Sequence, residues 1–158
     1  EIDDSKKWQK KHYQTLSQSY SKAKFYPDYK RELENFFTKD WTRLSEMNIK
    51  LSYLMMHWLE IDTPFIRSSE MKATGSGSDL ILNLCKEAGA TKYISGVGGN
   101  DYLEPDRFEK MGISIEYQSP ILPEPYPQLH QKIDFKNNLS ALDMILNCGK
   151  GWKSYIPK

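Results

Sequence analysis

The fold is decided by residues 92–118, which read KYISGVGGNDYLEPDRFEKMGISIEYQ. A short apolar strand leads into a glycine loop, and a short helix ending at Gly112 leads into an alternating strand at 113–117. A strand followed by a helix and then by another strand is typical of parallel pairing with a right-handed crossover. The stretch therefore predicts an α/β fold.

The preceding residues repeat this order. A short strand is expected at 64–67, and a Gly/Ser loop leads from it into an apolar helix over 79–88 that Gly89 ends. Together with strands at 92–95 and 113–117, this predicts a short, mostly parallel, Rossmann-like sheet of three strands.

Residues 6–60 predict a helical N-terminal half. Aromatic and apolar side chains recur every three or four positions, a third helix is expected to start near Asp40 or Trp41, and Pro64 forbids its continuation. We expect one domain over 1–158, in which this half packs on an α/β portion at 64–149. Three strands are few for a sheet covered on both faces, so we expect either a missing N-terminal segment or a second copy of the chain to complete it.

Composition excludes several classes of protein. The 158 residues hold 22 Lys and Arg against 21 Asp and Glu, a net charge of +1 that argues against a nucleic-acid binder. No apolar run is long enough to cross a membrane, so we expect a cytoplasmic protein without membrane insertion. Two cysteines, Cys85 and Cys148, form no disulfide framework, no ligand cluster has metal spacing, and no motif identifies a cofactor.

A glycine loop follows the strand at 92–95, at the edge where open α/β sheets bind ligands. Glycines let backbone N–H groups approach an anion, although a tight turn with left-handed positions is the alternative. Asp101 stands where a dinucleotide fingerprint needs glycine. The residues expected to bind a ligand here are Ser95, Gly96, Gly98, Gly99, Asn100 and Tyr102.

Ser68 and Ser69 follow the strand expected at 64–67 and are assigned to the same ligand site. If the strands are parallel, the loops 68–79 and 95–102 lie at one edge of the sheet and share a pocket.

Two side chains are candidates for catalysis. Asp101 ends the glycine loop and either takes a proton from a substrate or caps the following turn. His12 shares a helix face with Trp8 and either packs there or lines a substrate cleft. A third acidic residue, Asp143, lies in an otherwise apolar helix, where its carboxylate must be paired or hydrogen-bonded.

Seven segments resemble, in order, motifs of the WbqC-like proteins. The glycine-loop run at 93–103 resembles the family's Y-L-S-G-x-G-G-x-x-Y-L segment, and 20–25 resembles Y-x-K-A-P-[YF], with Lys24 in place of Pro. The others are Trp8 to His12, Ser68-Ser69, 79–90, Tyr126-Pro127-Gln128 and 139–149. The family's N-terminal part, with its Q-P-x-x-F-P-x-x-G-Y motif, is expected to be absent from this chain.

The resemblance implies a bacterial role in surface polysaccharides of the O-antigen (lipopolysaccharide) type. The implied activity is transfer of an amino acid or another acyl group to a nucleotide-linked amino sugar, so the expected partner is a small nucleotide-sugar. The alternative is a non-catalytic module that binds a ligand or a protein.

Overall fold

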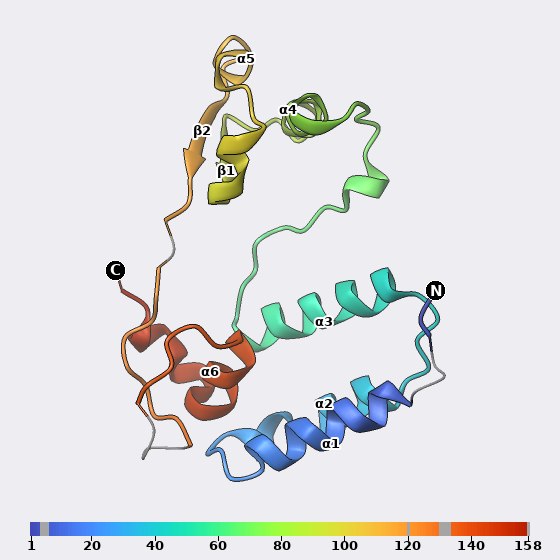
Figure 1. The fold of residues 1–158 in the computed structure, drawn as a ribbon, viewed down its shortest axis with the longest axis vertical. Coiled ribbons are helices and arrows are strands. Elements are labelled where there is room, and N and C mark those ends of the chain that lie inside the picture. The colour runs from blue at the N-terminus through green and yellow to red at the C-terminus, as the bar shows by residue number, and fades with distance from the viewer. Residues whose placement is uncertain (4–6, 120, 130–133, 158) are drawn as a thin grey trace. The chain divides into compact units, whose positions relative to one another are not determined.

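The computed structural model describes residues 1–3, 7–119, 121–129 and 134–157 (Figure 1). The chain divides into two compact units. The first unit comprises Glu1–Asp62 and Ile121–Lys158, and the second comprises Thr63–Pro120.

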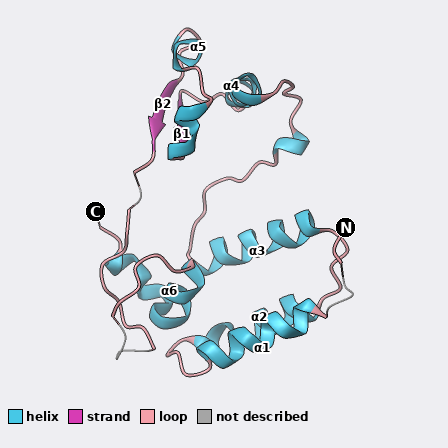
Figure 2. Ribbon diagram, viewed as in Figure 1, coloured by secondary structure: helices cyan, strands magenta, loops and turns pink. Residues whose placement is uncertain are grey.

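Helices build the first unit (Figure 2). The helices α1 (Trp8–Tyr20) and α2 (Tyr26–Thr38) lie side by side, and α3 is Leu44–Trp58. The helical prediction for 6–60 is confirmed over these ranges, while its first residue lies outside the described ones. None of the helices in the described residues has both the length and the apolar character needed to cross a membrane.

The helix α6 (Ala141–Cys148) closes the core of the first unit. Its N-terminus is capped by Ser140, whose hydroxyl accepts a hydrogen bond from the Leu142 N–H at 3.2 Å. Ile145 and Leu146 are completely buried against α2 and Trp58. A 3₁₀ helix, Gly149–Tyr155, follows α6 directly.

The second unit alternates helices and strands. In order it contains α4 (Gly77–Glu87), β1 (Lys92–Ser95), α5 (Pro105–Glu109) and β2 (Ser114–Tyr117). The two strands pair in parallel, with Lys92 opposite Ser114 and Ser95 opposite Tyr117. The chain is therefore an α/β protein, and the parallel pairing predicted for these strands is confirmed.

Apolar side chains from both helices and both strands form the core of the second unit. Phe108 of α5 is completely buried there, with Leu82 and Cys85 of α4 close by. Gly89 and Gly112 follow α4 and α5 at φ values of 68° and 72°. Glycine adopts this left-handed backbone without strain, which explains why both helices end where the sequence predicts.

The expected third strand does not form. Residues 64–67 have no helix or strand, and the sheet of the described residues has two strands. Pro64 has no N–H to donate to a ladder, and a 3₁₀ turn, Ser68–Glu70, begins immediately after Arg67. Only three residues remain between these two features, so the prediction of three strands is wrong, and a Rossmann-like sheet is not confirmed.

Candidate ligand-binding site

A buried carboxylate, that of Asp143, accepts hydrogen bonds from several segments of the first unit. Asp143 of α6 is 5% exposed, and its two oxygens accept four hydrogen bonds. Oδ1 accepts from the Tyr20 hydroxyl at 2.9 Å and from the Asn147 amide at 3.2 Å. Oδ2 accepts from the Tyr126 hydroxyl at 2.7 Å and from the Gln128 amide at 3.1 Å. The prediction that this carboxylate must be hydrogen-bonded is confirmed.

The four donors limit what Asp143 can do. A carboxylate has about four lone-pair sites, and here each of its oxygens already accepts two hydrogen bonds. No site is left to take a proton from a substrate amine. Asp143 is therefore a positioning residue that joins the end of α1, the 126–128 segment and α6.

The two tyrosines of this network are held as neutral phenols. Burial raises the pKa of both Tyr20 and Tyr126, and the hydrogen bonds that they donate to Asp143 raise it further. Ionising either hydroxyl would place a second negative charge beside the carboxylate and remove a donor.

The side chain of Gln128 extends the network to the backbone. Its Oε1 accepts a hydrogen bond from the Lys136 N–H at 3.1 Å, and its Nε2 donates to the Lys136 carbonyl at 2.9 Å. The orientation of the Gln128 amide is therefore fixed, because its oxygen accepts from the Lys136 backbone and its nitrogen donates to the Lys136 backbone and to Asp143.

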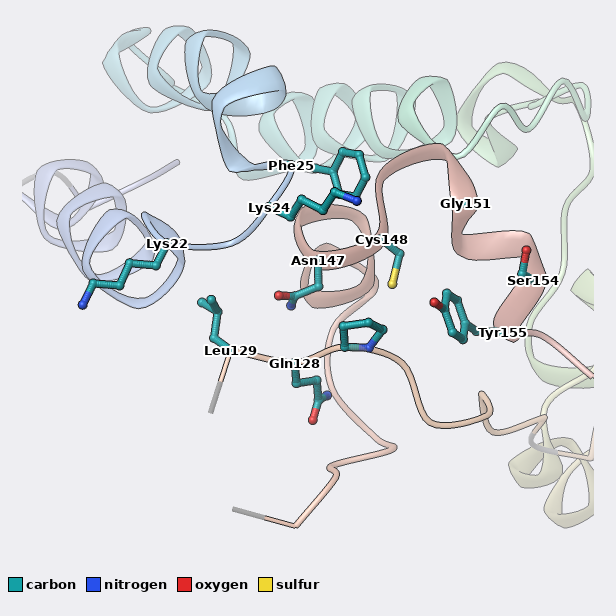
Figure 3. A pocket seen from close by; sticks show the side chains of 11 residues that line it. Lys22, Lys24, Phe25, Gln128, Leu129, Asn147, Cys148, Gly151, Ser154 and Tyr155 are labelled. Carbon is teal, nitrogen blue, oxygen red and sulfur yellow. The ribbon is translucent and has the colours of Figure 1, made fainter. Parts of the chain in front are cut away.

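Two cavities lie beside this network. One, of about 350 Å³, includes Tyr20, Lys136 and Asp143 in its wall. The other, of about 420 Å³, is shown in Figure 3 and is called the lysine pocket below. Its wall consists of Lys22, Lys24, Phe25, Pro127, Gln128, Leu129, Asn147, Cys148, Gly151, Ser154 and Tyr155.

The described lining of the lysine pocket carries positive charge. Among the described residues that line it, two are lysines and none is Asp or Glu. Gln128 and Asn147 join its wall to the Asp143 network. A cavity of this size that carries cations, amides and aromatic rings suits a polar anionic small molecule.

Cys148 is the one thiol in this wall, and it is not activated. It is buried, and burial together with the charge of Asp143 raises its pKa to about 11. Because the thiolate is the nucleophile, a thiol with so high a pKa is poorly suited to covalent catalysis near neutral pH.

The predicted glycine loop lies in the second unit. Ser95 ends β1, is 3% exposed, and donates a hydrogen bond from its hydroxyl to the Gly96 carbonyl at 3.0 Å. The 3₁₀ helix Val97–Asp101 follows, in which the Asn100 amide donates to the Val97 carbonyl at 3.0 Å. Gly99 is packed tightly, since a Cβ there would lie 2.9 Å from Cδ1 of Leu103, whereas one at Gly96 or Gly98 would meet no atom within 4 Å.

The other predicted residues lie at the surface. Asp101 and Tyr102 are exposed at the end of this loop, and Ser68 and Ser69 are exposed in their 3₁₀ turn. The start of α4 does meet the far end of the glycine loop, because the Ser78 hydroxyl accepts the Glu104 N–H at 3.1 Å. Ligand binding by these residues stays a prediction, as does the pocket shared by the two loops.

His12 lies on the exposed face of α1 in the first unit. Its ring meets that of Trp8 edge-on, with centroids 5.5 Å apart. The two roles predicted for it, packing and lining a cleft, both stay predictions. In the described parts of the chain, no three His, Cys, Asp or Glu side chains lie close enough together to hold a metal ion.

The comparisons identify the family. The model of the WbqC-like protein family matches residues 1–155, so the chain belongs to this family and the resemblance seen in the sequence is confirmed. The chain is 26% identical over 154 residues to the uncharacterized protein Rv1507c of Mycobacterium tuberculosis (strain ATCC 25618 / H37Rv). The match covers 97% of this chain but 66% of that protein. No solved structure matches the chain, and the absence of an N-terminal family segment stays a prediction.

The Asp143 network contains four residues to which the sequence analysis assigned no role. Tyr20, Tyr126, Gln128 and Asn147 all belong to segments that resemble the family's motifs, but none was expected to bind or position a ligand. The sequence feature that bears on them is Asp143, because a carboxylate in an apolar helix needs hydrogen-bond donors from elsewhere in the chain.

Proposed function

We propose that the protein acts in the biosynthesis of an O-antigen-type surface polysaccharide, and that it transfers an amino acid or another acyl group to a nucleotide-linked amino sugar. The observation that carries this proposal is the lysine pocket, which combines two cations with amide and aromatic groups and has no carboxylate among its described lining residues. The motifs that place the chain in the WbqC-like family support the same assignment.

The chemistry of such a transfer divides into binding and reaction. The sugar amine attacks the acyl carbon, a C–N bond forms as the bond to the donor's leaving group breaks, and the amine loses a proton. Lys22 and Lys24 supply positive charge for the phosphates of the acceptor. Asp143 holds Gln128 and Asn147 in the wall of the pocket and takes no proton itself. Within the first unit, the candidate for the base that receives the amine proton is His12, which is exposed on α1.

The second candidate is a non-catalytic module that binds a ligand or a protein. One observation favours it: the groups of the first unit best suited to reaction are already occupied or unreactive. Asp143 has accepted its four hydrogen bonds, and burial raises the pKa of the Cys148 thiol.

Two measurements separate these functions. Calorimetric titration with a panel of uridine, guanosine and thymidine diphosphate amino sugars tests binding, and mass spectrometry after addition of an activated acyl or aminoacyl donor tests transfer. A product whose mass increases by the acyl group supports the enzyme. Tight binding of a nucleotide-sugar without any such product across the donor panel supports the binding module, and no binding of any nucleotide-sugar contradicts the proposal.

A further inference from the structure

Lys24 lies on a backbone segment that is fixed on both sides. It belongs to the connection between α1 and α2, where the preceding Ala23 is 3% exposed in the core. The following residue, Phe25, donates its backbone N–H to the Leu146 carbonyl of α6 at 3.0 Å. The start of the Lys24 side chain therefore has a defined place although the side chain itself is exposed.

The ring of Phe25 directs the Lys24 ammonium. Nζ of Lys24 lies 5.0 Å from the centroid of this ring, within the range of a cation–π interaction. The ring itself is held against Gly149, where a Cβ would lie 2.6 Å from its Cδ1. A cation–π contact uses the charge of the ammonium without removing its N–H groups, so Lys24 keeps donors for a ligand.

The two lysines of the pocket lie differently. Figure 3 shows Lys24 running along Phe25 with its ammonium beside the ring, whereas Lys22 extends away from the other lining residues. The Tyr155 hydroxyl is turned toward the pocket, and Ser154 adds a second hydroxyl to the wall. A cation with no carboxylate among the described lining residues, in a wall that also carries two hydroxyl groups, suits a phosphate group.

We propose that Lys24 binds the phosphate group of the ligand in the lysine pocket and thereby selects a phosphorylated sugar over a neutral one. This inference rests on the proposed function of the pocket and specifies the residue that recognises the phosphate. Lys22 contributes only long-range attraction from the rim.

The experiment measures binding of four probes to the full chain by calorimetry. Inorganic pyrophosphate, uridine diphosphate and uridine diphosphate N-acetylglucosamine carry the phosphate, while the neutral sugar N-acetylglucosamine does not. The variants are Lys24→Gln, Lys24→Arg and Lys22→Gln, with Lys11→Gln as a matched control, because Lys11 is an exposed lysine of α1 outside the pocket wall.

We expect Lys24→Gln to weaken all three phosphate probes by at least about tenfold, as for the loss of one charge-assisted hydrogen bond. Lys24→Arg should retain most of the affinity, Lys22→Gln should lose less than Lys24→Gln, and Lys11→Gln should bind as the original chain does. The fall in affinity with added salt should also be less steep in Lys24→Gln.

Two results overturn the inference. One is unchanged affinity of Lys24→Gln for pyrophosphate and uridine diphosphate, and the other is equal affinity of the original chain for N-acetylglucosamine and the phosphate probes. The proposed function would fail in a different way from these two results. The phosphate probes would bind and their binding would depend on Lys24, but no acyl group would be transferred to any amino sugar.

Discussion

The Tyr126 hydroxyl donates a 2.7 Å hydrogen bond to Oδ2 of Asp143, and both residues are buried. This bond connects the 126–128 segment to α6, and the Tyr20 hydroxyl connects the end of α1 to the same carboxylate at 2.9 Å. The Asp143 carboxylate therefore links three segments of the first unit, the end of α1, residues 126–128 and α6. The lysine pocket is formed by residues of these segments and their neighbours.

Replacing Tyr126 with Phe removes this donor and keeps the ring. We expect the free energy of unfolding of the first unit to fall by about 1.5–3 kcal/mol, since the lost hydrogen bond is to a charged group. All four tryptophans lie in the first unit, so tryptophan fluorescence during urea denaturation reports on this unit. Gln14→Ala, at an exposed position of α1, serves as the control and should change stability by no more than about 0.5 kcal/mol. Equal effects of the two substitutions would contradict the assigned role of Tyr126.

The tyrosine network also predicts how stability depends on alkaline pH. The pKa values of Tyr20 and Tyr126 are raised above the usual 10.0 in the folded chain, so their contribution is fully present below pH 10. Above pH 10 the unfolded chain releases these protons and the folded chain does not, so stability falls as the pH rises further. Unfolding followed by fluorescence should show this loss, and the double variant Tyr20→Phe, Tyr126→Phe should show a shallower one. An identical slope in the double variant would contradict the prediction.

Gly149 permits the close approach of α6 and Phe25. Its φ is 55°, and a Cβ would lie 2.6 Å from the Phe25 ring, so Gly149→Ala adds both backbone strain and a clash. We expect a loss of about 2–4 kcal/mol in the stability of the first unit. Gly151→Ala is the matched control in the same 3₁₀ helix, because a Cβ there meets nothing within 4 Å. Urea denaturation compares the two, and a Gly149→Ala variant as stable as Gly151→Ala would show that the approach is not tight.

Local patterns in the sequence predicted most of the helices and the parallel strand pair. Periodicity located α1, α2 and α3, and glycines marked the ends of α4 and α5. The start of α3 differs, because the chain places Trp41 in the core before the helix begins at Leu44. There its indole N–H donates to the Phe36 carbonyl at 2.8 Å. A propensity argument does not detect a tertiary hydrogen bond of this kind.

The site was less predictable for a similar reason. The sequence showed that Asp143 needs partners, but Tyr20 is 123 positions away and its hydroxyl could not be paired with Asp143 from local spacing. The expected strand at 64–67 was wrong because the four residues from Pro64 up to the 3₁₀ turn at Ser68 are few for a ladder, and apolar character alone does not supply a partner strand. The three glycines after β1 led to the prediction of a ligand site in that loop. The lysine pocket was not predicted, because its lining residues come together only in the folded chain.

The glycines of the loop that follows β1 in the second unit differ in what surrounds them. Gly99→Ala should destabilise this unit by about 1–3 kcal/mol, since its Cβ would lie 2.9 Å from Cδ1 of Leu103, whereas Gly98→Ala should not. Asp101→Asn changes an exposed side chain and should leave the melting temperature, followed by circular dichroism, unchanged. If Asp101 contacts the ligand, the same substitution weakens nucleotide-sugar binding or slows turnover. A lower melting temperature with unchanged affinity and turnover would instead identify Asp101 as a cap of the turn that leads to Tyr102.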